Sequence, residues 1–93
     1  MTLHVDLWVK PNAGPALQKT FRDVFYPAIR AQPGFVKSAL LRTHPETDLY
    51  RLIITFENED LRLKWVATDT HQQVWPQMEA HCARYDGKIF EAV

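Results

Sequence analysis

The sequence has little of what several large classes of protein require. Its one cysteine, Cys82, cannot form an internal disulfide, and its three glycines, at 14, 34 and 87, do not form a phosphate-binding loop. Eleven basic residues balance eleven acidic ones without a basic block, so nucleic acid and membrane surfaces are not expected as partners. The apolar runs are far shorter than the roughly 20 residues that cross a bilayer.

The first residues also lack a secretory pattern. Residues 1–6 have neither a basic start nor a long apolar run, so we expect a cytoplasmic protein. The 93 residues, 46% of them hydrophobic and 24% charged, suit one domain that buries its own core. A domain of this size buries only about two thirds of the surface of its unfolded chain, so a second copy would add stability. We therefore expect a single domain over residues 1–93 that forms a homodimer.

Periodic patterns predict the first elements of the fold. Apolar residues alternate with polar or mixed ones over residues 3–9, which is typical of a strand with two different faces. Pro15 suits the first turn of a helix, and the apolar residues from 17 to 29 follow the spacing of one helical face. Pro27 interrupts this helix, so we expect a kink or a fresh last turn before the helix ends at residues 31–34.

Two strands and a second helical region should follow. Residues 35–42 and 49–57 favour strands, and the short polar stretch between them predicts an antiparallel hairpin. Asn58 and Thr68 are each suited to cap a helix, and Pro76 argues against one straight helix in this region. One helical face should carry Val74, Trp75, Met78 and Cys82.

The C-terminal residues complete a symmetrical order of elements. Asp86-Gly87 predicts a turn, and residues 88–93 have the length and composition of a strand. The resulting order βαββαβ indicates an α+β protein of the ferredoxin-like type, with helices on one face of an antiparallel sheet. The other face then needs cover, and another subunit is the simplest cover.

Three stretches carry a resemblance to a known family. They are the opening strand at residues 3–9, the helix ending at 31–35, and residues 56–60 leading into 65–72. Through them nearly the whole chain resembles the antibiotic biosynthesis monooxygenase family. The resemblance implies a dimeric α/β barrel with a pocket between the helices and the sheet of each subunit. It also implies one of several activities, because members include cofactor-free oxygenases of aromatic polyketides, a quinol oxygenase type and haem-degrading enzymes.

The haem-degrading branch is a poor match in its pocket residues. That branch has an Asn on the first strand, a Trp in the second helical region and a His about three turns later. Trp65 matches the Trp, but Trp75 stands at the place of the His, and the first strand offers His4 and Asp6 instead of Asn. Because no axial ligand is evident, the resemblance favours chemistry without a cofactor.

Cofactor-free oxygenation needs a base, a dry aromatic pocket and donors that hold a developing anion. His71 is the leading base, since it shares a helical face with Trp75; the alternative is a partly exposed structural His after the Thr68 cap. Trp65 is expected to stack on a flat substrate, with Trp75 and Trp8 as further substrate contacts, although core packing explains all three equally well.

His4 and Asp6 are two residues apart on the strand face that Trp8 shares and that should turn away from the helices. Asp6 could orient His4 as in a base dyad, which makes Asp6 a catalytic candidate and His4 a substrate-binding one; a dimer salt bridge is the alternative. No pair of histidines or Cys82 has the spacing of metal ligands, so no metal is expected. Nothing near Cys82 lowers its pKa, so we expect a small buried residue there.

These residues predict a cofactor-independent monooxygenase of a small aromatic, polyketide or quinol-like metabolite. His71 would act as base, Trp65 would stack on the substrate, and Asp6 or His4 would be auxiliary polar groups. Two alternatives use the same fold. In an isomerase or cyclase the same His would move a proton without oxygen, and in a non-catalytic dimer the aromatic pocket would only hold a small ligand.

Overall fold

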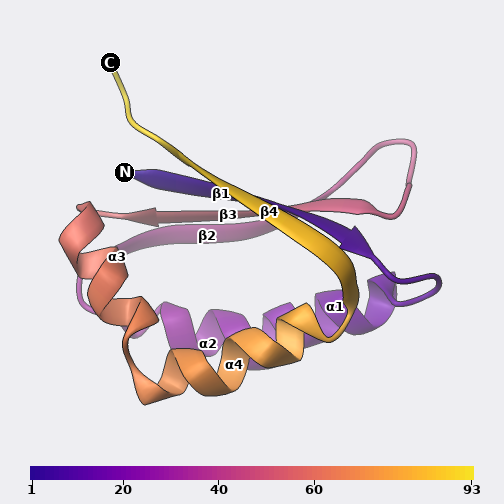
Figure 1. Ribbon diagram of the computed structural model, residues 1–93, viewed down its shortest axis with the longest axis horizontal. Coiled ribbons are helices and arrows are strands. Elements are labelled where there is room, and N and C mark those ends of the chain that lie inside the picture. The colour runs from indigo at the N-terminus through magenta and orange to yellow at the C-terminus, as the bar shows by residue number, and fades with distance from the viewer.

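The computed structural model describes residues 1–93, which form one antiparallel sheet with helices on a single face (Figure 1). The strands, in the spatial order β2-β3-β1-β4, are β1 (Thr2–Val9), β2 (Phe35–Arg42), β3 (Leu49–Phe56) and β4 (Cys82–Phe90). The helical segments are α1 (Gly14–Thr20), the π-helical η1 (Phe21–Phe25), α2 (Tyr26–Ile29), α3 (Glu59–Val66) and α4 (Asp69–Glu79). The predicted α+β ferredoxin-like fold is confirmed.

The central strand β1 shows how the sequence divides the two faces of the sheet. It pairs with β3 and β4, so that Val5 lies opposite Leu52 on one side and Gly87 on the other. Side chains alternate along a strand, and residues directly opposite each other share a face. Val5, Leu7 and Val9 are buried toward the helices, whereas the residues between them are half-buried on the open face.

The hydrophobic core lies between the sheet and the helices. Its fourteen buried residues include no charged side chain. The first helical region contributes Leu17, Phe25 and Ile29, and α4 contributes Val74 and Met78. Burying a large apolar side chain stabilises a fold by about 1.5–3 kcal/mol, so this layer supplies most of the driving force for folding.

The first helical region changes its winding before Pro27, as the sequence predicts. Tyr26 donates its backbone N–H to Phe21 five residues earlier, which is the π-helical pattern, and Pro27 then stands in the first turn of α2. Proline has no N–H to continue the preceding ladder, which explains the fresh turn. The chain leaves α2 through Gly34, whose φ of +80° suits glycine and where a Cβ atom would collide with the Leu61 side chain.

Both predicted caps are present in the second helical region. Asn58 accepts a hydrogen bond from the N–H of Leu61 at 2.9 Å, and Thr68 accepts one from the N–H of His71 at 3.1 Å. The break between α3 and α4 falls before Thr68. Pro76 does not end α4, which continues to Glu79.

The C-terminal strand corrects two predictions. Asp86-Gly87 is not a turn, because β4 passes straight through both residues while pairing with β1. The long ladder outweighs the local turn preference of the dipeptide. Cys82 begins β4 rather than lying on the face of α4, although it is buried as expected. None of the helices is long and apolar enough to cross a membrane.

Candidate functional site

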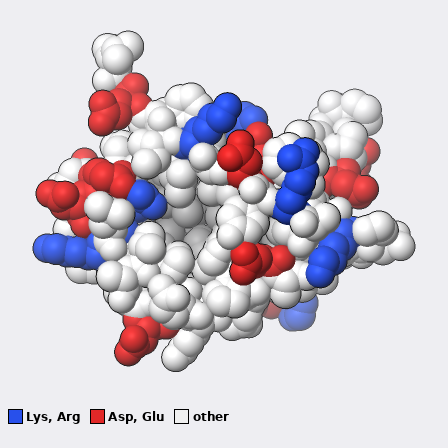
Figure 2. Space-filling model, in the orientation of Figure 1, with Lys and Arg blue, Asp and Glu red and all other residues white.

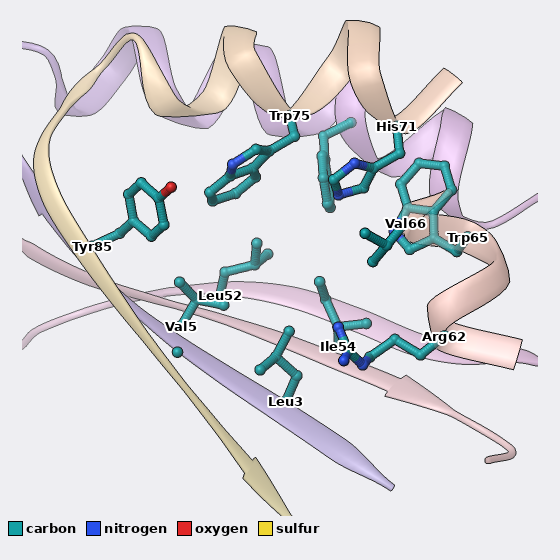
Figure 3. A pocket seen from close by; sticks show the side chains of 12 residues that line it. Leu3, Val5, Leu52, Ile54, Arg62, Trp65, Val66, His71, Trp75 and Tyr85 are labelled. Atoms are coloured by element: carbon teal, nitrogen blue, oxygen red, sulfur yellow. The ribbon is translucent and has the colours of Figure 1, made fainter. Parts of the chain in front are cut away.

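An apolar cavity of about 200 Å³ lies between the sheet and the second helical region. Figure 3 shows the side chains that line it. Its floor consists of Leu3, Val5, Leu52 and Ile54 from the two central strands. The remaining lining residues are Phe25, Arg62, Trp65, Val66, His71, Trp75, Tyr85 and Gly87. Figure 2 shows a hollow in this face of the molecule whose walls carry few charged side chains.

His71 enters this cavity from the first turn of α4, and its ring makes no hydrogen bond within the protein. The Thr68 cap holds its backbone N–H, while the ring points into the cavity and meets Trp65 edge to face, with ring centres 5.1 Å apart (Figure 3). Nδ1 is buried and has no hydrogen-bond partner in the protein. A buried polar atom without a partner costs about 1–3 kcal/mol, so the imidazole is suited to bind a polar group of a ligand.

The surroundings of His71 keep it neutral. Burial lowers the pKa of the imidazole below its ordinary value of 6.5, and the positive charge of Arg62 lowers it further. The ring therefore carries no proton charge at pH 7 and can accept a proton from a bound hydroxyl group. This combination of geometry and protonation state is what a general base requires.

The two tryptophans predicted as substrate contacts both line the cavity. Trp65 is only 3% exposed and packs against the edge of Phe25, so it is also a core residue. Trp75 is half-buried and contacts Phe25 and Tyr85, with ring centres 6.4 Å and 5.2 Å away. Such edge-to-face contacts hold the indoles in place and give the cavity flat aromatic walls.

Arg62 is a cavity residue that the sequence analysis missed. Its side chain is only 15% exposed and forms an ion pair with Glu59 one helical turn earlier. Figure 3 shows its guanidinium reaching toward the floor beside Ile54. The spacing of Arg62, Trp65 and Val66 places them on one face of a helix, and this was the available signal.

Tyr85 was missed for a different reason. It lies on β4 opposite Leu7 and therefore on the helix-covered face, but the last strand was predicted to begin only at residue 88. Its ring is 45% exposed and stands at the opposite end of the cavity from Arg62 (Figure 3). The Glu79 carboxylate raises the pKa of its hydroxyl, so Tyr85 remains a neutral phenol at pH 7.

The other three candidates lie on the open face of the sheet. Asp6 pairs with Arg51 at 2.7 Å, His4 packs against Phe90, and Trp8 lies 3.7 Å beneath the guanidinium carbon of Arg84. The ion pair also holds the pKa of the Asp6 carboxyl below its usual range. The sheet therefore separates these residues from the cavity that holds His71, Trp65 and Trp75 in the same chain.

The sequence profile of the family described as antibiotic biosynthesis monooxygenase matches residues 1–76. The chain belongs to the antibiotic biosynthesis monooxygenase family. The matched residues include all the strands and helices that build the cavity except β4 and the last turn of α4. A comparison with curated protein sequences finds no match.

Solved structures of this family have the same fold. A variant of SnoaB, a cofactor-independent oxygenase from Streptomyces nogalater, is 20% identical with a TM-score of 0.87, over 98% of this chain and 90% of that one. A proposed antibiotic biosynthesis monooxygenase from Caulobacter crescentus CB15 is also 20% identical, with a TM-score of 0.84 over 99% and 88% of the chains. At this identity the likeness establishes a monooxygenase-like fold and leaves the activity to the site.

Proposed function

We propose that this protein is a cofactor-independent monooxygenase that acts on a small aromatic, quinol-like metabolite. The observation that carries this proposal is the partnerless imidazole of His71 in an apolar cavity with aromatic walls. A hydroquinone can give an electron to oxygen once it is deprotonated, so the protein must supply only a base, a dry site and a positive charge. His71, the aromatic walls and Arg62 meet these three needs.

The proposed reaction balances with oxygen as the sole co-reactant. His71 takes a proton from a ring hydroxyl, and the phenolate passes one electron to O₂, which gives a semiquinone and superoxide. The two radicals join in a C–O bond, and the protonated His71 returns its proton to the peroxide. The ring carbon then loses its hydrogen as a proton and the O–O bond breaks, so that water leaves and a carbonyl remains. The sum is quinol plus O₂ giving hydroxyquinone plus water.

In this proposal the cavity residues divide the work. Trp65 and Trp75 stack on the ring of the substrate, the positive charge of Arg62 favours a phenolate that forms nearby, and Tyr85 stands at the opposite end of the cavity. A cation in a site sheltered from water is worth far more to a developing anion than one in solvent. These assignments name the residues of the monooxygenase-like fold that we propose carry out the reaction.

We also propose that the protein works as a homodimer that joins through the open face of the sheet. No helix covers this face (Figure 1), and Trp8 and Ile53 lie on it half-buried. Asp6 pairs with Arg51 within the same face, which lowers the cost of burying its charges. His4, Asp6 and Trp8 are then assigned to the subunit contact rather than to catalysis. Sedimentation velocity over a range of concentrations measures this association.

Oxygen uptake tests the catalytic proposal. Purified metal-free protein is mixed with hydroquinones and dihydroxynaphthalenes, and the rate of autoxidation without protein is subtracted. We expect uptake with one atom of ¹⁸O₂ in the product, and a fall of about 10²–10⁴-fold in His71→Asn, the usual contribution of a general base.

His44→Asn is the matched control, because His44 is exposed in the loop between β2 and β3. It should keep the wild-type rate. Uptake that persists unchanged in His71→Asn would exclude His71 as the base. Ligand binding without any uptake would instead support the isomerase, cyclase or ligand-holding functions.

A further inference from the structure

The cavity contains one permanent charge, the guanidinium of Arg62, and no carboxylate lines it. Glu59 binds this group from one side, through Nε and Nη2. Nη1 has no hydrogen bond to the protein, so the edge formed by Nη1 and the second Nη2 hydrogen is free. A largely buried guanidinium with a free edge is well suited to bind an anion.

The size of the cavity limits the ligand. An apolar cavity of about 150 Å³ accepts a single benzene ring, and sites for drug-sized molecules measure about 300–1,000 Å³. This cavity, at about 200 Å³, is closer in size to the benzene site than to the sites for drug-sized molecules. One ring with substituents, or two fused rings, therefore suits it better than three or four rings do.

The position of Arg62 also fixes how a ligand would lie. Arg62 and Tyr85 stand at opposite ends of the cavity, and His71 points in from the helical side at the end that Arg62 occupies (Figure 3). The charge of Arg62 reaches His71, since it lowers the pKa of that imidazole. A flat ligand whose anionic group binds Arg62 would thus place a neighbouring ring hydroxyl near His71.

We propose that Arg62 is the specificity-determining residue of this site and selects a one- or two-ring hydroxyarene carboxylate, whose carboxylate binds the free edge of its guanidinium. This proposal rests on the proposed function and names its substrate class. A carboxylate is favoured over a phenolate because carboxylic acids titrate near pH 4 and phenols near pH 10, so only the former is an anion at neutral pH. The two oxygens of a carboxylate also match the two donors of the free edge.

Binding of unreactive ligands tests this selection without turnover. Naphthalene-2-carboxylate and its uncharged carboxamide differ in charge but hardly in shape, and calorimetry or tryptophan fluorescence reports their affinities. We expect wild-type protein to bind the carboxylate at least about tenfold more tightly, which corresponds to one charge-assisted hydrogen-bonding contact. Anthracene-2-carboxylate should bind more weakly than the two-ring acid.

Arg62→Met should remove the preference for the carboxylate while leaving the affinity for the carboxamide unchanged. The unchanged carboxamide affinity also shows that the variant is folded. Arg22→Met is the matched control, because Arg22 is exposed on η1 and binds Asp23 outside the cavity; it should behave like wild type. Equal wild-type affinities for the two ligands, or a preference that survives in Arg62→Met, would overturn the proposal.

Oxygen uptake separates this inference from the function on which it rests. The substrates compared are 1,4-dihydroxynaphthalene with and without a carboxylate at position 2. Uptake that is equal for the two refutes selection by Arg62 and leaves the oxygenase proposal standing. A carboxylate preference in binding without uptake on either substrate supports the Arg62 site and refutes the oxygenase.

Discussion

The two faces of the sheet differ in how their polar groups are satisfied. On the open face, Asp6 pairs with Arg51 and the guanidinium of Arg84 stacks on the Trp8 ring, so each of these charged groups already has a partner on a neighbouring strand. On the covered face, the cavity holds an imidazole without a partner and a guanidinium with a free edge.

Alternation along the strands separates the two faces, but Arg62 and His71 come from α3 and α4, so only the covered face has polar groups left for a ligand. Groups that already bind each other gain little from a small molecule, whereas partnerless buried groups gain a hydrogen bond. We therefore propose substrate chemistry on the covered face and subunit association on the open one.

Two neighbouring residues of β3 offer the sharpest contrast between the faces. Leu52 is fully buried beneath the helices, and Ile53 lies on the open face. Leu52→Ala should lower the free energy of unfolding by about 2–5 kcal/mol, because it removes transfer energy and leaves a cavity. Chemical denaturation at low protein concentration measures this loss.

Ile53→Glu should instead leave the isolated subunit folded and weaken association, since it places a new charge in the proposed contact. Sedimentation velocity should show a shift toward monomer at concentrations where the wild type is dimeric. If the wild type is monomeric throughout, or if Ile53→Glu dimerises as well as wild type, the open face is not the dimer contact.

A smaller effect is expected in the titration of His71. Its pKa lies below 6.5 because of burial and the charge of Arg62, while Tyr85 and Arg62 are the other titratable groups that line the cavity. As the pH falls through 6.5, His71 is therefore protonated in the unfolded chain before it is protonated in the folded protein. The free energy of unfolding that the neutral imidazole contributes decreases below that pH. NMR should show His71 titrating below 6.5, and Arg62→Met should move its pKa upward. An unchanged value in that variant would show that Arg62 does not act on the imidazole.

Sequence patterns predicted the fold more fully than the site. The strand bounds of β1 and β2, the caps at Asn58 and Thr68 and the fresh turn at Pro27 depend on local periodicity and backbone chemistry, which a sequence displays directly. The C-terminal strand was misjudged because a long ladder with β1 overrides the turn preference of Asp86-Gly87.

The residues that line the cavity were predicted in part, again because local spacing is visible in a sequence and tertiary packing is not. His71, Trp65 and Trp75 come from one helical region, so helical spacing could group them. Tyr85 comes from the misjudged strand, and Arg62 resembles the exposed charges around it until the tertiary structure buries it. His4, Asp6 and Trp8 were grouped correctly on one strand face, but whether that face meets the cavity depends on packing between layers.

The smallest expected effect concerns the ion pair on the open face. In the isolated subunit Asp6 and Arg51 are partly exposed, with side-chain exposures of 29% and 48%, and water screens such pairs. At concentrations where the protein is monomeric, Asp6→Asn should therefore leave the unfolding midpoint at pH 7 nearly unchanged. The lowered pKa of Asp6 makes its small stabilisation present at neutral pH and lost as the pH falls through the folded value, so the wild type and Asp6→Asn should converge in acid. Oxygen uptake should stay at the wild-type rate, because the sheet separates Asp6 from His71; a large loss of activity in a variant that still dimerises would return Asp6 to the catalytic site.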